Sequence, residues 1–119
     1  MAKICVLEDD RDIREVIEWI LEAEEYEVVS YSTIHDFMGR DLKEQPGLYL
    51  LDVMLPDGSG LDVCNHLRNE SEHKTTPIVM MSAHANFKQI CSACNADGFV
   101  AKPFELDNFL QIIGTHVKH

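Results

Sequence analysis

The sequence lacks any apolar run that approaches the ~20 residues needed to cross a lipid bilayer. It is also poor in basic residues, with 10 Lys and Arg against 21 Asp and Glu, so that its net charge is −11. This balance argues against direct binding to DNA or RNA, because such binding needs basic side chains to displace phosphate counterions. The opening residues, MAKICVLEDD, hold too short an apolar stretch for a signal peptide. We therefore expect a soluble, cytoplasmic protein that makes no membrane contact.

Internal repeats, low-complexity tracts and linkers are also missing from the sequence. A chain of 119 residues is long enough for one domain with a real core and too short for two. We therefore expect residues 1–119 to form a single domain. The excess of acid has two interpretations, which composition does not separate: it keeps the protein soluble, or part of it lies in a cation site.

Two kinds of segment alternate along the chain. Short apolar runs predict strands, and apolar residues repeated every three or four positions predict helices. The expected strands cover residues 3–7, 27–31, 48–53, 77–82 and 98–101. The expected helices cover residues 12–24, a segment from Thr33 as its cap to Leu42, and residues 59–69, 85–95 and 105–117.

This alternation predicts an α/β fold. Strands that are joined by crossover helices must be parallel, and right-handed crossovers place helices on both faces of the sheet. A sheet covered on both faces needs continuously apolar strands, such as KICVL, LYLLDV and PIVMM. The chain should therefore form a doubly wound (βα)5 three-layer sandwich around a five-stranded parallel sheet.

The helical periodicity also predicts which side chains face the core. Val16 and Leu106 fall on inward-facing stripes, whereas Trp19 and Ile112 lie off the stripes and are expected at the surface. Ile112 is thereby a candidate contact for dimerisation or output.

Polar side chains stand at the carboxyl ends of four predicted strands. In an open α/β sheet the ligand site lies outside these ends, where the strand order reverses. Residues far apart in the sequence would therefore converge on one edge. They are Glu8, Asp9 and Asp10 after the first strand, Asp52 at the end of the third, Ser82, Ala83 and His84 at the fourth, and Lys102 and Pro103 after the fifth.

The chemistry of this group favours phosphoryl transfer. Neighbouring carboxylates repel one another unless a cation shares their site, and Mg²⁺ prefers such oxygen ligands. Lys102 and Ser82 can bind phosphoryl oxygens, which would leave Asp52 placed to attack phosphorus and form an acyl phosphate. A carboxylate nucleophile has no proton to lose, so this reaction needs no general base.

Helix capping is the simpler explanation for an acid after a strand, and Asp10 or Asp12 is expected to cap the first helix. Capping does not explain two acids, a hydroxyl and a lysine on four separate strand ends.

Four segments, KICVLEDD, LLDVMLPDGSG, PIVMMSA and GFVAKPF, resemble the motifs of response-regulator receiver domains of two-component signalling. They occur in the order and spacing of that family, and the resemblance covers essentially the whole chain. It implies a flavodoxin-like sheet with strand order 2-1-3-4-5.

The resemblance also implies a role for individual residues. Asp52 would be the phosphoacceptor, and Mg²⁺, or Mn²⁺ in its place, would be held by Glu8, Asp9, Asp52 and the backbone carbonyl of Met54. Many relatives have Asp-Asp where this chain has Glu8, whose longer side chain would reach the ion through water. The phosphoryl-binding and switch residues would be Ser82, Ala83, Phe99 and Lys102, with a cis bond before Pro103, and Met54 and His84 would tune the lifetime of the phosphoryl group.

A protein of this family would be a signalling domain rather than an enzyme in the usual sense. It would accept its phosphoryl group from a sensor histidine kinase or a histidine phosphotransfer protein. Phosphorylation would then change the surface formed by the fourth helix, fifth strand and fifth helix, which would meet an output domain or a second copy.

Other interpretations of the motifs are weaker. Cys91 and Cys94 form a C-x-x-C pair of the kind seen in redox or zinc sites, but both fall on the inward stripe in mid-helix, which favours burial as small hydrophobic residues. Haloacid-dehalogenase-like phosphatases need a second acid where this chain has Met54. A flavin-binding domain would need a polar, glycine-rich loop in place of EDDRD. A receiver-like scaffold that is never phosphorylated would not need the intact set of acids, hydroxyl and lysine.

Overall fold

A five-stranded parallel sheet forms the centre of the computed structural model, which describes residues 2–41, 43, 45–70, 75–83, 89 and 94–118. The sheet order is β2-β1-β3-β6-β7, which reads 2-1-3-4-5 when these five strands are counted along the chain. The predicted fold class and strand order are therefore confirmed. The strands are β1 (Lys3–Leu7), β2 (Glu27–Tyr31), β3 (Leu48–Asp52), β6 (Ile78–Ser82) and β7 (Gly98–Ala101).

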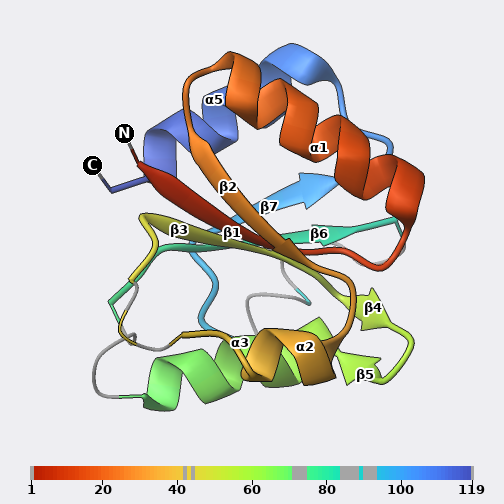
Figure 1. The fold of residues 1–119 in the computed structure, drawn as a ribbon, viewed down its shortest axis with the longest axis vertical. Coiled ribbons are helices and arrows are strands. Elements are labelled where there is room, and N and C mark those ends of the chain that lie inside the picture. The colour runs from red at the N-terminus through yellow and green to blue at the C-terminus, as the bar shows by residue number, and fades with distance from the viewer. Residues whose placement is uncertain are drawn as a thin grey trace.

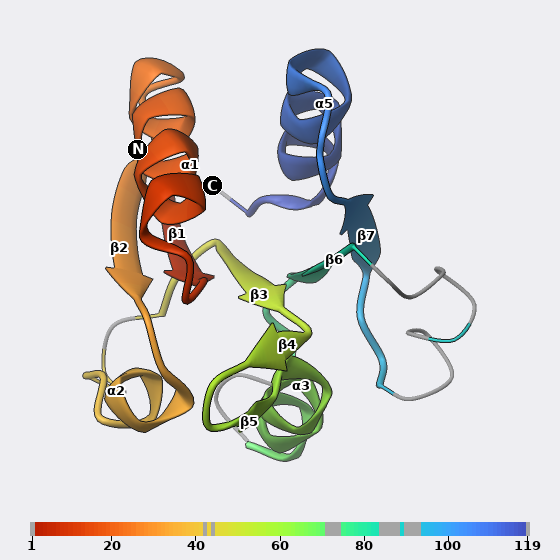
Figure 2. The same cartoon turned by 90° about the vertical axis from the view of Figure 1, so that its right-hand side faces the viewer.

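Helices cover both faces of the sheet. Figures 1 and 2 show α1 (Arg11–Ala23) and α5 (Leu106–His116) on one face, and α2 (Ile34–Met38) and α3 (Gly60–Asn69) on the other. The predicted helix over residues 85–95 lies almost entirely outside the described residues, as does Leu42 of the second helix. Within the described part of the chain, no helix combines the length and apolar character needed to span a membrane.

The sheet separates two hydrophobic cores, because successive residues of a strand point to opposite faces. Ile4, Val6 and Leu50 pack with residues of α1 and α5 in one core. Tyr49 and Leu51 pack with residues of α2 and α3 in the other. Every residue of β3 is buried, as expected for a central strand covered on both faces. Each fully buried aliphatic side chain stabilises the fold by roughly 1.5–3 kcal/mol.

Side-chain caps begin three of the helices. Asp10 caps α1 by accepting a hydrogen bond from the Ile13 N–H at 3.1 Å, which decides between Asp10 and Asp12 as the predicted cap. Thr33 caps α2 as predicted, and Ser59 caps α3. Each cap satisfies one backbone N–H that has no partner within its helix.

The structure corrects the predicted burial of three helical side chains. Val16 and Leu106 are 48% and 50% exposed rather than buried. Val16 lies at the margin of the stripe that α1 presents to the sheet. At the start of α5 it is Phe104, stacked on Phe109 at 4.7 Å, that covers the core. Conversely, Ile112 is half-buried against that core, so its predicted exposure is wrong. Trp19 is 74% exposed, as predicted.

A short hairpin follows β3 and was not predicted. Its strands, β4 (Met54–Leu55) and β5 (Gly58–Ser59), pair antiparallel. The Asp57 carboxylate at its turn accepts hydrogen bonds from the backbone N–H groups of Ile34 and His35, both at 3.0 Å. These bonds lower the pKa of Asp57 and attach the hairpin to the first turn of α2. Gly58 has φ +152°, a conformation that L side chains rarely adopt.

The start of α3 touches the end of β3 so closely that only glycine fits. The Gly60 N–H donates to the Val53 carbonyl at 2.7 Å, and a Cβ on Gly60 would lie 1.8 Å from the Asp52 carbonyl oxygen. Gly114 in α5 is the opposite case, since a Cβ there would meet nothing within 4 Å.

We expect Gly60→Ala to lower the free energy of unfolding by roughly 1–3 kcal/mol, because the backbone of β3 or α3 must shift. Gly114→Ala, its matched control, should raise that free energy by roughly 0.5–1 kcal/mol through helix propensity. Urea unfolding of the two variants measures both changes. A Gly60→Ala variant as stable as the parent chain would contradict the close approach.

Candidate functional site

The carboxyl ends of four sheet strands meet at one edge of the molecule. Glu8 follows β1, Asp52 ends β3, Ser82 ends β6 and Lys102 follows β7. Parallel pairing brings these ends together: Asp52 is in register with Met81, next to Ser82. The Lys102 N–H donates to the Ser82 carbonyl at 3.0 Å. The convergence predicted from the sequence is therefore present in the structure.

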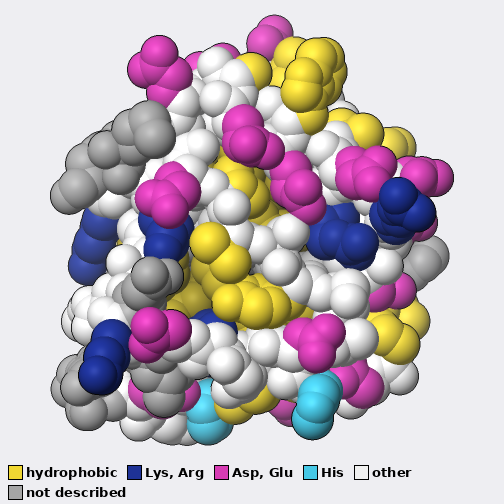
Figure 3. All heavy atoms as spheres, viewed as in Figure 1, with side chains coloured by type: hydrophobic (Ala, Val, Ile, Leu, Met, Phe, Trp, Pro, Cys, Tyr) yellow, Lys and Arg dark blue, Asp and Glu magenta, His cyan; other side chains and the backbone are white. Residues whose placement is uncertain are grey.

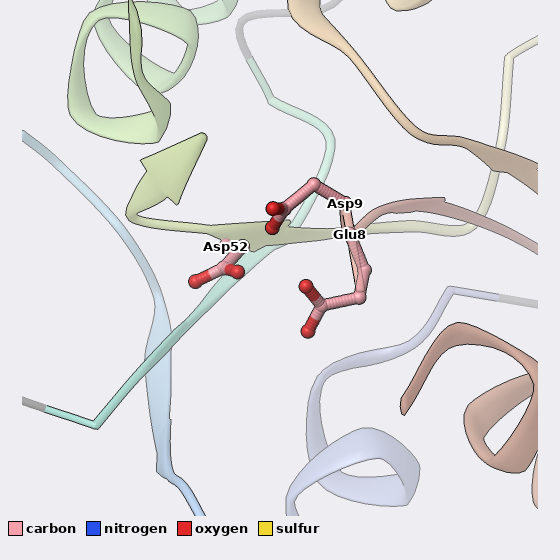
Figure 4. Close-up of side chains that lie close together, drawn as sticks. All are labelled: Glu8, Asp9 and Asp52. Carbon is pink, nitrogen blue, oxygen red and sulfur yellow. The ribbon is translucent and has the colours of Figure 1, made fainter. Parts of the chain in front are cut away.

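Three carboxylates gather at this edge. One oxygen from each of Glu8, Asp9 and Asp52 lies within 4.8 Å of the other two, and Figure 4 shows the side chains projecting from the ends of β1 and β3. Glu8 and Asp52 are buried, whereas Asp9 is exposed. Most other acidic side chains are spread over the surface among fewer basic ones, as the face in Figure 3 illustrates. The acid excess is thus largely a surface property, with one small cluster at this site.

Lys102 lies between two of these carboxylates. Its ammonium donates one hydrogen bond to Glu8 Oε1 and another, at 2.9 Å, to Asp52 Oδ2. All three side chains are largely buried. The peptide bond from Lys102 to Pro103 is cis. The convergence of Lys102 and Glu8 on this edge was predicted, but their direct hydrogen bond was not, because Lys102 was assigned to phosphoryl oxygens and Glu8 to a cation.

Burial and charge together set the protonation of this group. Burial raises the pKa of Glu8 to about 7, and the neighbouring Asp52 carboxylate adds to this shift while the hydrogen bond from Lys102 opposes it. Burial lowers the pKa of Lys102, but its bonds to Glu8 and Asp52 outweigh this effect and raise the pKa overall. Lys102 therefore stays protonated at neutral pH, and Glu8 is the group that titrates.

Arg14 supports the loop that carries the acidic pair, and sequence reasoning missed it. Its guanidinium donates to the Glu8 carbonyl at 3.0 Å and to the Asp9 carbonyl at 3.4 Å. The available signal was its position in the first turns of α1, four residues after the cap Asp10, from which a long side chain reaches back over the loop.

A pocket of about 140 Å³ opens beside the Asp52 carboxylate. Ser82 is buried at its wall, Ala83 is exposed, and the Met54 side chain is 64% exposed. Phe99 lies on β7, half-buried against the core under α2 and α3. His84 lies outside the described residues. The pocket is lined by Asp52, Met54, Ser82, Ala83 and Lys102.

The arrangement offers the donor set of a hard cation. Three carboxylates on one edge match the oxygen ligands that Mg²⁺ prefers, and the site carries more negative charge than one ammonium neutralises. The pocket adds a hydroxyl and an ammonium on the open side of Asp52, which suit an anionic group with several oxygens.

Comparisons of the sequence with family models and with curated proteins point to the same family. The family model for the response regulator receiver domain matches residues 4–114. The response regulator ArlR of Staphylococcus saprophyticus is 31% identical over 112 residues, which are 92% of this chain and 50% of that protein. This chain spans about half the length of the curated relatives it matches.

Solved structures agree in fold. The chemotaxis protein CheY4 of Vibrio cholerae has a TM-score of 0.90 at 26% identity, covering 98% of this chain and 99% of that one. The response regulator TrrA of Thermotoga maritima, solved in complex with Mg²⁺–BeF, has a TM-score of 0.85 at 25% identity, covering 98% of this chain and 100% of that one.

The raised pKa of Glu8 makes stability depend on pH. Because the pKa is about 7 in the folded state against an ordinary value of 4.5, the folded state holds the proton more tightly. The protonation of Glu8 therefore adds to the free energy of unfolding. This stabilisation is complete below pH 4.5 and is lost as the pH rises through 7. Between pH 4.5 and pH values above 7, we expect the free energy of unfolding of the parent chain to fall by up to roughly 3 kcal/mol relative to that of Glu8→Gln. Urea unfolding in a metal chelator measures it, and parallel stability curves for the two proteins would refute the titration.

Proposed function

The chain belongs to the response regulator receiver domain family, and from this premise we propose that Asp52 is its phosphoacceptor in two-component signal transduction. The observation that carries the proposal is the Asp52 carboxylate at the wall of an open pocket, hydrogen-bonded to Lys102 at 2.9 Å. An oxygen of Asp52 attacks the phosphorus of a phosphohistidine donor in line with the breaking P–N bond. The product is an acyl phosphate on Asp52 and a neutral histidine on the donor.

The other residues of the pocket bind the transferred group. Lys102 moves from Glu8 toward a phosphoryl oxygen as a point charge, and the Ser82 hydroxyl donates to a second oxygen. No side chain needs to act as a general base toward Asp52. Lys102 also holds the two carboxylates together before the donor arrives, so the nucleophile is already positioned.

We assign the cation site to Glu8, Asp9, Asp52 and the backbone carbonyl of Met54. When bound, Mg²⁺ neutralises charge on the phosphoryl group, and Mn²⁺ would serve in its place. The gathered carboxylates support this assignment, as does the Mg²⁺–BeF complex of TrrA. Glu8 would contribute through its charge and, as the longer acid, would reach the ion through a water.

We further propose that phosphorylation switches the surface of β7, α5 and the helix predicted from the sequence over residues 85–95. Ser82 moves toward the phosphoryl group and Phe99 turns into the space it leaves, which shifts the population of two states because the phosphoryl group contacts one of them better. The acyl phosphate later hydrolyses in the same site. Met54, exposed at the pocket, and His84 tune the rate of that step.

The donor is a sensor histidine kinase or a histidine phosphotransfer protein. The switched face would meet an output domain or a second copy of the chain, and the greater length of the curated relatives is consistent with an output domain. The net charge of −11 does not favour nucleic-acid binding by this segment itself. The alternative of a scaffold that is never phosphorylated leaves the pocket and its buried lysine without a role.

Phosphorylation by acetyl phosphate with Mg²⁺ tests the proposal. We expect the intact chain to gain one acid-stable but base-labile phosphoryl group, seen as a mass increase, and Asp52→Asn to gain none. Asp62→Asn changes an exposed aspartate on α3 and serves as the matched control, which should be labelled normally. Equal labelling of Asp52→Asn and the parent chain would reject Asp52 as the acceptor.

A further inference from the structure

Two cysteines that are distant in the sequence touch in the structure. Cys64 lies on α3, and Cys94 lies shortly before β7. Both are buried in the same hydrophobic core cluster, with exposed fractions of 0% and 3%, and their side chains hydrogen-bond to each other. The sequence predicts burial for both Cys91 and Cys94; Cys94 is buried, and Cys91 lies outside the described residues.

The surroundings favour a thiolate on Cys94. The hydrogen bond from the Cys64 thiol lowers the pKa of Cys94, and burial opposes this shift. The Ala96 N–H and the Arg68 guanidinium lower the pKa further, so that it falls to about 7. Arg68 is held close by hydrogen bonds to the Asn95 carbonyl at 2.8 Å and the Thr76 carbonyl at 2.7 Å.

The thiols of Cys64 and Cys5 ionise less readily than that of Cys94. The hydrogen bond to Cys94, followed by burial, raises the pKa of Cys64, which makes Cys64 the proton donor of the pair. Cys5 is also buried, but it lies on β1, and burial raises its pKa to about 12. Cys5 is therefore a buried thiol with no tendency to ionise near neutral pH and provides an internal control.

We propose that Cys64 and Cys94 form a reversible disulfide when the protein meets hydrogen peroxide, and that this bond ties α3 to the segment leading into β7. The proposal rests on the place of both cysteines in one buried cluster, and on Arg68 of α3, which bonds to the carbonyl of Asn95, the residue after Cys94. It does not depend on phosphorylation of Asp52.

The chemistry balances with one molecule of peroxide. The Cys94 sulfur attacks a peroxide oxygen, the O–O bond breaks, and a sulfenic acid forms while hydroxide leaves and takes the proton of Cys64 to become water. The Cys64 sulfur then attacks the sulfenic sulfur, the S–O bond breaks, and the hydroxide that leaves takes a proton from solvent. Two thiols give two electrons, and the products are one disulfide and two waters.

The bond would tie α3 to the segment that precedes β7. Phe99 lies a few residues after Cys94 on β7, so the restraint would act on the strand that carries it. A cross-link between segments distant in sequence also restricts the unfolded chain, so the oxidised protein should melt at a higher temperature than the reduced one.

The test is to treat the full chain with hydrogen peroxide, alkylate the remaining thiols and map its peptides without reduction. We expect a cross-linked pair of peptides that contains Cys64 and Cys94, a loss of two alkylatable thiols, and full recovery with dithiothreitol. Cys64→Ser and Cys94→Ser should each lose this cross-link. Cys5→Ser and Asp52→Asn should keep it, and the second of these separates the inference from the proposed phosphoacceptor.

Three results would overturn the proposal: a cross-link between Cys91 and Cys94, cross-links only between separate molecules, or unchanged thiols after prolonged exposure. Circular dichroism of each variant checks its folding. A Cys91→Ser variant keeps the test decisive if one of the other variants fails to fold, because it should form the Cys64–Cys94 bond as the parent chain does.

Discussion

The contact of Lys102 with two buried carboxylates is the interaction on which the site depends. The ammonium bonds to Glu8 after β1 and to Asp52 at the end of β3, while its own backbone continues from β7. Three strands are thereby joined at one edge by charge as well as by the sheet. Removing one member of a buried charged group leaves the others uncompensated, which costs roughly 3–5 kcal/mol in comparable pairs. Lys102 thus permits the burial of both carboxylates.

The single ammonium of Lys102 does not neutralise all the carboxylate charge at the site. This excess of negative charge links the fold to its proposed chemistry. One ammonium faces two buried carboxylates, with the exposed Asp9 beside them. Burial and the second carboxylate raise the pKa of Glu8, so protonation of Glu8 relieves part of the excess negative charge. A divalent cation would relieve it more completely and would release Lys102 from Glu8. The same electrostatic imbalance therefore explains the titration of Glu8, the attraction for a cation and the availability of a lysine for a phosphoryl group.

Sequence reasoning predicted the parallel sheet and the convergence of Asp52, Ser82 and Lys102, because the carboxyl ends of parallel strands must share an edge. The strand order was implied only by the family resemblance. It missed features that periodicity does not encode. The strands of the β4–β5 hairpin are too short to show a periodic pattern. Val16 lies at the margin of its helical stripe and Leu106 lies at the start of α5, and at such positions the helical period does not ensure that a side chain is buried. The contact between Cys64 and Cys94 depends on how α3 packs beside the segment before β7, which the spacing of cysteines in the sequence does not encode.

In the proposed mechanism, Lys102 exchanges Glu8 for the phosphoryl group while it remains near Asp52. A crystal structure of this chain with Mg²⁺ and beryllium fluoride, as obtained for TrrA, tests this exchange most directly. We expect fluoroberyllate on Asp52, the metal beside Glu8 and Asp9, and the Lys102 ammonium on a fluorine atom with its bond to Glu8 broken. An unmodified Asp52, with Lys102 still bonded to both carboxylates in a crystal saturated with both reagents, would contradict it.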